Sequence, residues 1–264
     1  PVPRPLPATG KRVAVVGAGP SGLTCAYFLG LMGHEVTVFE QRQQLGGMMR
    51  YGIPAYRFPR QRLDEDLQAI CSLPNLEVRA NSPIDGDGLK RLAGEYDATY
   101  VAIGAQGGKM LTLPGSDAAG VMSAVDLLEA IGDGNYPDFT GKNVVVIGGG
   151  NVAMDCARTS VRAGAQSVTV AYRRRLEDMT ALPVEVEAAI AAGVEMMCLQ
   201  APARIEVDAA GAACVLLCQP QRIGAVKRGR PVPEVADKPL LRIPADIVLV
   251  AVGQAIESAP FEEA

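Results

Sequence analysis

The sequence predicts an α/β protein with two Rossmann-like units, in which parallel sheets carry helices on both faces and small antiparallel sheets lie beside them. Three observations carry this prediction. A glycine-rich turn of the form G-x-G-x-x-G/A follows a short β-branched run twice, within residues 13–22 and 144–153. Each turn leads into helix-forming sequence and then a second apolar run. A strand that ends in glycine follows in both halves, at 101–105 and 250–254, which indicates an internal duplication of one folding unit.

The first unit begins with a compact βαβ pattern. We expect a strand at 12–16, a helix at 20–32 and a second strand at 35–39, and this context favours a nucleotide-binding role for the glycine turn. The glycine-rich segment 44–54 is expected to form a loop against a ligand. The other elements predicted here are a helix at 60–72, short strands near 76–80 and a buried parallel strand over 97–104 that ends in a glycine turn.

The second unit repeats this order. We expect a strand at 143–147, a helix at 151–163 and a strand at 167–172. The elements predicted after them are a helix at 183–192, antiparallel strands near 203–207, 213–219 and 239–243, a charged, proline-rich hairpin or loop at 222–239, and a closing strand at 246–253.

Composition excludes several classes of function. The chain of 264 residues has no Trp, only 5% aromatic residues and a formal net charge of −4, so we expect no nucleic-acid partner. No apolar run approaches the ~20 residues that span a bilayer, so we expect no membrane insertion. The six cysteines contain no C-x-x-C pair, which is typical of thiols in a reducing cytoplasm and argues against a metal site, an internal iron–sulfur cluster or a redox-active disulfide.

Each glycine turn predicts a site for the pyrophosphate of a dinucleotide. The N-terminus of the following helix offers free N–H groups and a favourable dipole to a negative charge. Three glycine positions have different roles in such a turn. The residues are Gly17 and Gly148 for the tight turn, Gly19 and Gly150 for close approach to the phosphates, and Gly22 and Ala153 for packing of the helix on the strand.

The residue that ends the second strand distinguishes the two nucleotides. Glu40 ends it in the first unit, where a carboxylate can accept hydrogen bonds from a ribose and repels a 2′-phosphate, so FAD or NAD is expected there. In the second unit the strand ends in the three arginines of 173–175, which suit the 2′-phosphate of NADP(H). The alternative is a solvated basic cluster balanced by Glu177 and Asp178.

These residues carry a resemblance to a known family. The chain resembles the two-dinucleotide-binding flavoproteins and, within them, the small (beta) subunit of NADPH-dependent glutamate synthase and its relatives, which include dihydropyrimidine dehydrogenase. The resemblance extends from about residue 10 through nearly the whole chain. Its most specific segments are Tyr-Gly-Ile-Pro at 51–54 and Gly-Gly-Asn-Val-Ala-Met-Asp at 149–155.

The resemblance implies an NADPH oxidoreductase module that passes a hydride from NADPH to FAD and electrons on to an iron–sulfur partner or a larger catalytic subunit. It assigns no catalytic side chain, because hydride transfer needs alignment more than acid–base chemistry. The implied FAD-binding residues are Gly17, Gly19, Pro20, Ser21, Gly22, Glu40, Leu45, Gly46, Gly47 and Gly104. The implied NADPH-binding residues are Gly148, Gly150, Asn151, Val152, Arg173 and Arg174.

The expected organisation is a proline-rich linker over 1–10, the first part of the FAD-binding domain over 11–110, the NAD(P)H-binding domain over 111–249 and an incomplete return to the FAD-binding domain over 250–264. The family usually adds an iron–sulfur domain before the flavin domain and a Gly-Asp segment after the return. The sequence lacks both and is therefore interpreted as truncated at both ends. A non-catalytic nucleotide-binding subunit, or a fragment with a lost flavin site, is the alternative; a disulfide reductase is disfavoured by the missing cysteine pair.

Overall fold

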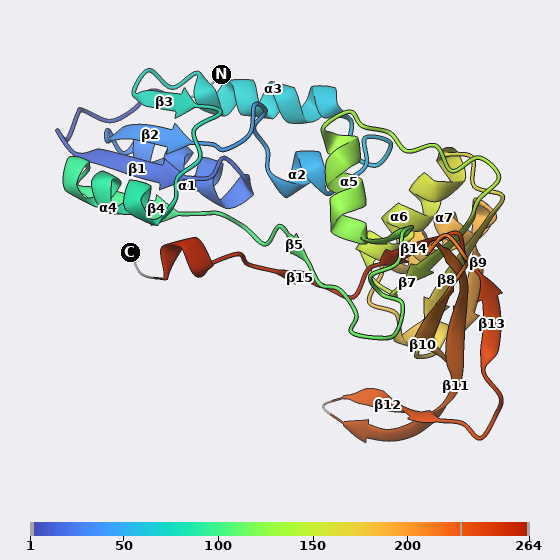
Figure 1. Ribbon diagram of the computed structural model, residues 1–264. Helices are drawn as coiled ribbons and strands as arrows, with labels where there is room; N and C mark the ends of the chain where they lie inside the picture. Colours follow the sequence, from blue (N-terminus) through green and yellow to red (C-terminus); the bar gives the residue numbers. More distant parts are fainter. Residues whose placement is uncertain (1–2, 228, 263–264) are drawn as a thin grey trace. The chain divides into compact units, whose positions relative to one another are not determined.

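The computed structural model describes residues 3–227 and 229–262, so the first two residues of the expected linker lie outside the described residues. The chain divides into two compact units (Figure 1). The first unit comprises Pro1–Gly107 and Ala255–Ala264, and the second comprises Gly108–Gln254. The α/β prediction with parallel sheets and small antiparallel sheets is confirmed.

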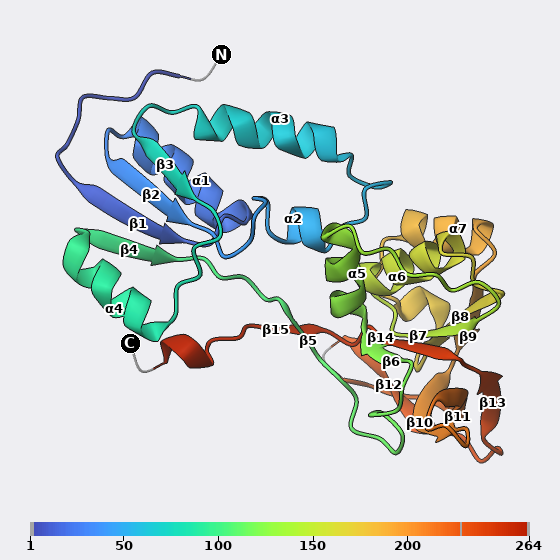
Figure 2. The same ribbon diagram turned by 45° about the horizontal axis from the view of Figure 1, so that its top comes forward.

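The first unit is built on a four-stranded parallel sheet of order β3-β2-β1-β4. Helices cover both faces, as Figure 2 shows. Buried Val15, Val36 and Val38 pack against α1 and α3, while Ala14, Val16 and Phe39 pack against α4. The elements are β1 (Arg12–Val16), α1 (Pro20–Leu31), β2 (Glu35–Phe39), α2 (Met48–Tyr51), α3 (Arg60–Cys71), β3 (Leu76–Arg79), α4 (Gly86–Glu95) and β4 (Ala98–Val101).

Three features of the first unit differ from expectation. The strand expected to be buried over 97–104 is the short edge strand β4, which pairs with β1 and leaves Tyr100 and Val101 41% and 43% exposed. The segment 44–54 contains the one-turn helix α2. The described part of the expected linker lies along the end of α1, where the N–H of Leu6 donates to the carbonyl of Leu31 at 2.9 Å.

The second unit is built on a five-stranded parallel sheet of order β6-β14-β7-β8-β9. One face packs against α5, α6 and α7 through buried Val144, Val146 and Val170. The other face packs against the antiparallel sheet, where Val145 of the parallel sheet and Leu216 of the antiparallel sheet belong to one buried cluster. The elements are β6 (Val121–Ser123), α5 (Ala124–Gly132), β7 (Asn143–Ile147), α6 (Asn151–Arg162), β8 (Ser167–Tyr172), a 3-10 turn η1 (Leu176–Asp178), α7 (Pro183–Ala191), β9 (Glu195–Cys198) and β14 (Ile247–Val250).

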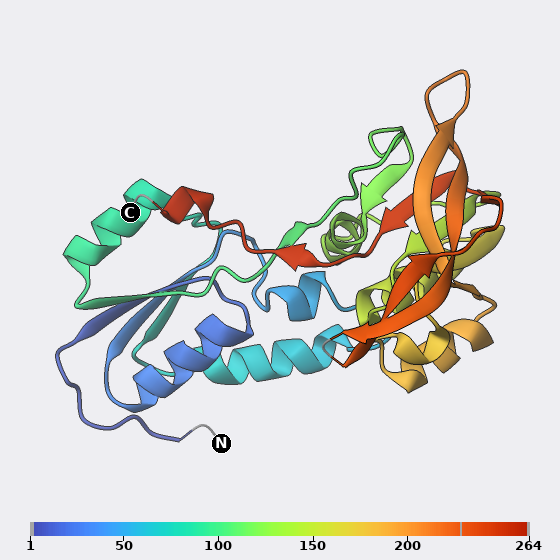
Figure 3. The ribbon, with the colours of Figure 1, turned by 90° about the horizontal axis from the view of Figure 1, so that it is seen from below.

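The antiparallel sheet is organised around one long strand. β11 (Ala213–Lys227) pairs with β10 (Gln200–Val207) and β13 (Leu241–Pro244) along its first part and with β12 (Arg230–Val235) along its last part. Figure 3 shows β11 continuing into the hairpin with β12. The remaining elements are the paired β5 (Gly107–Gly108) and β15 (Gln254–Ala255), and η2 (Ala259–Phe261). None of the helices in the described part of the chain has the length and apolar character needed to cross a bilayer.

Candidate functional site

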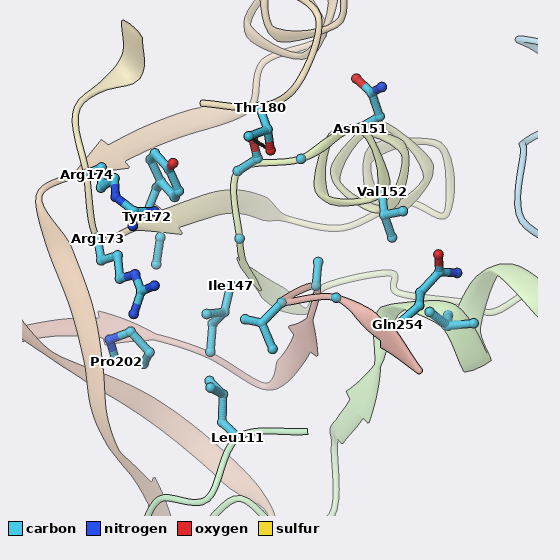
Figure 4. Close-up of a pocket in the computed structure, with 18 of the residues that line it drawn as sticks. Leu111, Ile147, Asn151, Val152, Tyr172, Arg173, Arg174, Thr180, Pro202 and Gln254 are labelled. Carbon is cyan, nitrogen blue, oxygen red and sulfur yellow. Dashed lines mark hydrogen bonds between the residues drawn. The ribbon is translucent and has the colours of Figure 1, made fainter. Parts of the chain in front are cut away.

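The second unit contains a cavity of about 440 Å³ at the carboxyl ends of its parallel strands. Ligands of open α/β sheets bind at this edge. Figure 4 shows Arg173 and Arg174 on one side of the cavity and Asn151 and Val152 at the start of α6 on the other. All six residues predicted for the second nucleotide line it: Gly148, Gly150, Asn151, Val152, Arg173 and Arg174.

The glycine turn of the second unit is pressed against the closing strand. Gly148 has φ +150, and a Cβ there would collide with the carbonyl oxygen of Ala251. Gly150 is the N-cap of α6 and makes no side-chain capping hydrogen bond. The first N–H groups of α6 are therefore available to a negatively charged ligand in the cavity.

The three arginines at the end of β8 do not share one role. Arg175 pairs with Glu177 and with Asp178, where Nε lies 2.9 Å from Oδ2, and it does not line the cavity. The side-chain hydrogen bonds that Arg175 donates to Asp178 raise the pKa of Arg175 and lower the pKa of Asp178. Of the three arginines that follow β8, only Arg173 and Arg174 line the cavity. Arg175 instead fits the alternative interpretation, a basic residue balanced by neighbouring acids.

The first unit contains a cavity of about 740 Å³. Its glycine turn repeats the contact seen in the second unit, because a Cβ on Gly17 would collide with the carbonyl oxygen of Ala102. The segment around Gly47 meets this turn, and a Cβ on Gly47 would lie 2.8 Å from the Cα of Gly19. The predicted residues that line this cavity are Gly17, Gly19, Pro20, Ser21, Glu40, Gly47 and Gly104.

Glu40 is a buried carboxylate at the end of β2 that organises the glycine turn. It is 6% exposed. Its Oε2 accepts from the N–H of Ala18 at 2.7 Å, and its Oε1 accepts from the N–H of Arg42 at 2.9 Å. A carboxylate has about four acceptor positions, so Glu40 retains the capacity to accept from ribose hydroxyls.

Three predicted residues do not line this cavity. Gly22 lies under the turn, where a Cβ would collide with the carbonyl oxygen of Gly17. The carbonyl of Leu45 accepts from Nε of Arg50 at 2.7 Å, and Gly46 has φ +116. Their contact with a flavin stays a prediction.

Several lining residues were not predicted from the sequence. In the first unit they include Ile256 and Phe261, which arrive after the chain has passed through the second unit. The signal in the sequence that could have identified these two residues is that apolar residues follow the closing strand. In the second unit the residues missed are Leu111, Val125, Ile147, Gly149, Ala171, Tyr172, Thr180, Pro202, Arg230, Ala251, Val252, Gly253 and Gln254.

The thiols and the histidine do not form a reactive centre in the described residues. All six cysteines are free, and burial raises the pKa of the Cys218 thiol to about 12. Within residues 3–227 and 229–262, no group of three or more His, Cys, Asp and Glu side chains could hold a metal ion. Nδ1 of His34 lies 2.7 Å from Oγ1 of Thr9 in the turn after α1, and His34 lines neither cavity.

Comparison with protein families gives two matches. The family described as pyridine nucleotide-disulphide oxidoreductase matches residues 74–264, and the one described as NAD(P)-binding Rossmann-like domain matches residues 15–77. Among solved structures, FprA of Mycobacterium tuberculosis in complex with NADPH superposes with a TM-score of 0.77 over 95% of this chain and 71% of that chain. At 20% sequence identity this similarity shows the fold.

Two curated relatives match nearly the whole chain. The beta subunit of the NADP(+)-dependent formate dehydrogenase of Moorella thermoacetica is 39% identical over 94% of this chain and 36% of its own length. The NADPH-dependent glutamate synthase small chain of Escherichia coli (strain K12) is 35% identical over 93% of this chain and 54% of its own length. The chain therefore spans between about a third and about half of the length of these relatives.

Proposed function

Because the chain belongs to the pyridine nucleotide-disulphide oxidoreductase family, we propose that it is the NADPH-oxidising flavoprotein module of a larger enzyme. Members of this family bind FAD and NADP(H). The glutamate synthase small chain is among the relatives, which confirms the resemblance that the sequence motifs indicate. When bound, the two groups supply hydride transfer from nicotinamide to flavin.

The difference between the two strand ends is the observation that carries the proposal. The second unit presents Arg173 and Arg174 to its cavity, and neither belongs to an ion pair of the described residues. Two guanidinium groups beside one cavity favour a 2′-phosphate, so we assign NADP(H) to this unit. Gly150, Asn151 and Val152 would hold the pyrophosphate at the start of α6.

The cavity of the first unit fits FAD better than a phosphorylated nicotinamide nucleotide. Glu40 lines this cavity at the end of β2, and a carboxylate there disfavours a 2′-phosphate because like charges repel. This cavity is the larger of the two, about 740 Å³ against about 440 Å³. We assign the flavin-binding role to the first unit and the NADP(H)-binding role to the second unit, whose cavity residues 251–254 also line.

The larger enzyme and its acceptor are part of the same proposal. The relatives above are named as a beta subunit and a small chain, which supports work with a larger catalytic subunit. We infer that the electrons pass from the flavin to an iron–sulfur group of that partner, since a reduced flavin can release single electrons. The free thiols support placement in the reducing cytoplasm.

Anaerobic visible spectroscopy of the purified chain tests the proposal. We expect a flavin absorption band that bleaches on addition of NADPH. A protein that carries flavin but is not reduced by NADPH contradicts the hydride-transfer role. A colourless protein that binds NADPH supports the second candidate, a non-catalytic nucleotide-binding subunit without a flavin.

Arg173→Ala tests the assignment of the second unit. Loss of a charge-assisted hydrogen bond to the 2′-phosphate costs about 1.5–3 kcal/mol, so we expect the Kd for NADPH to rise about 10- to 100-fold. The Kd for NADH should stay unchanged. Titration calorimetry measures both, and Arg175→Ala is the matched control because Arg175 is ion-paired outside the cavity. Equal weakening of NADH and NADPH contradicts the assignment.

A further inference from the structure

The cavity of the second unit receives a third arginine from outside the Rossmann strands. Arg230 is the first residue of β12 and lines the same cavity as Arg173 and Arg174. We propose that Arg230 contacts the 2′-phosphate of the bound nucleotide, so that the β11–β12 hairpin determines the preference for NADP(H) over NAD(H). This inference rests on the proposed assignment of NADPH to this cavity.

Hydrogen bonds hold the hairpin against the end of β8. Nε of Arg174 donates to the carbonyl of Pro231 at 3.3 Å, and Nη2 of Arg230 donates to the carbonyl of Asp178 at 3.4 Å. β12 therefore meets the segment after β8 at two adjacent residues. A phosphate bound between Arg173 and Arg174 would lie within the region that Arg230 also borders.

Three arginine side chains line the same cavity. None of the ion pairs found within residues 3–227 and 229–262 includes Arg173, Arg174 or Arg230, whereas Arg175 is compensated by Glu177 and Asp178. Like charges gathered at one cavity repel one another. A phosphate dianion relieves this repulsion and accepts several charge-assisted hydrogen bonds. The hydroxyl of NAD(H) at the same position does neither.

The hairpin is anchored in the core of the second unit. The first part of β11 contributes Leu216 and Cys218, which are fully buried, and pairs with β10 and β13. The last part continues into the hairpin, where Lys227 pairs in register with Arg230. An ion pair between Arg222 and Glu234 at 3.2 Å joins the two hairpin strands. The strand β11 therefore connects the core of the second unit to the hairpin that carries Arg230, with a register shift between Ile223 and Val226.

Arg230→Ala in the full chain tests the inference. We expect the Kd for NADPH to rise about tenfold, because the loss of one charge-assisted hydrogen bond corresponds to about one decade in Kd. The Kd for NADH should change by less than about twofold. Arg230→Lys should keep part of the preference, because it keeps the charge and loses the planar fork. Arg204→Ala is the control: it removes an exposed arginine of the neighbouring strand β10 that does not line the cavity.

The outcomes separate this inference from the proposed function. If the wild-type chain binds NADPH no more tightly than NADH, the assignment of NADP(H) to this cavity fails. If the wild type prefers NADPH and Arg230→Ala preserves the same ratio of Kd values, Arg230 is a solvated surface residue and the inference is overturned. Adenosine 2′,5′-bisphosphate and 5′-AMP differ only in the 2′-phosphate and both lack the nicotinamide half. The ratio of their Kd values in the wild type and in Arg230→Ala therefore measures the contribution of the 2′-phosphate alone. Thermal unfolding of Arg230→Ala checks that the fold is retained.

Discussion

Gly148 shows how a single residue controls the shape of a nucleotide turn. Its φ of +150 is disfavoured for residues with a side chain, and a Cβ there would collide with the backbone of the closing strand. Gly148→Ala combines backbone strain of about 1–3 kcal/mol with a comparable cost of overpacking. We therefore expect the free energy of unfolding of the second unit to fall by about 3 kcal/mol or more, as measured by urea denaturation.

Gly141→Ala is the matched control for this prediction. Gly141 also has a positive φ, +72, but a Cβ there has nothing within 4 Å. Only the cost of the left-handed conformation remains, about 1–2 kcal/mol. Equal losses of stability in the two variants would show that the backbone conformation, and not contact with Ala251, makes glycine necessary in the turn.

The parts of the site that depend on local sequence could be predicted. Gly148, Gly150 and Asn151 belong to one turn, and Arg173 and Arg174 end the next strand, so a single βαβ pattern places all of them. Reasoning from the sequence could not separate Arg175 from its neighbours. The difference depends on the 3-10 turn that brings Asp178 back to Arg175.

At the scale of elements, α6 and α7 are joined by an ion pair. Nη1 of Arg158 lies 2.7 Å from Oε2 of Glu185, and the two side chains are 16% and 13% exposed. Removing one member of a buried ion pair typically costs 3–5 kcal/mol, because the remaining charge loses a close opposite charge. Because this pair retains some exposure, we expect Glu185→Ala to lower the free energy of unfolding by about 2–3 kcal/mol in urea denaturation.

The double variant Arg158→Ala/Glu185→Ala distinguishes the pair from other contacts of Glu185. The double variant removes both charges of the pair, so it should lose less stability than the sum of the single variants. Glu187→Ala, on the exposed side of the same helix, should change stability by less than about 0.5 kcal/mol. Strict additivity of the two single variants would contradict a direct interaction.

Elements with strong β-branched runs could be predicted, and those with mixed signals could not. β1 and β7 each combine such a run with a glycine turn. Helix α4 contains Gly86, Gly88 and Gly94, and glycine lowers helix propensity by about 1 kcal/mol per residue, so no helix was predicted there. The apolar sequence of β4 suggested a buried strand, but burial depends on neighbouring strands that local sequence does not specify.

At the scale of the whole molecule, each unit has its own core. Buried clusters around Val15 and Ala14 belong to the first unit, and those around Val144 and Val145 belong to the second. A ligand that binds one folded unit stabilises that unit by mass action, by about 2.7 kcal/mol at 100 times its Kd. We expect calorimetry to show NADPH raising the melting temperature of one transition by roughly 5–10 °C.

FAD should raise the other transition, and Arg173→Ala should reduce the shift caused by NADPH at the same concentration by about half or more. A single transition that both ligands move together would contradict independent unfolding of the units.

The residues that complete each cavity explain why the sequence predicted the units better than the sites. Pro202, Arg230 and Gln254 come from strands far along the chain, so their convergence depends on long-range pairing that no local pattern records.

The contact between each glycine turn and its closing strand has a consequence for folding order. The carbonyl of Ala102 takes the space that a Cβ on Gly17 would need, and the carbonyl of Ala251 does the same at Gly148. Each turn therefore gains its full packing only when a strand synthesised much later takes its place beside the first. Closing such a long loop costs entropy before the contact compensates for it. A nascent chain that has emerged only as far as α6 would therefore carry the complete second glycine motif without a rigid turn. Nucleotide affinity would arise late in synthesis, when β14 joins the sheet.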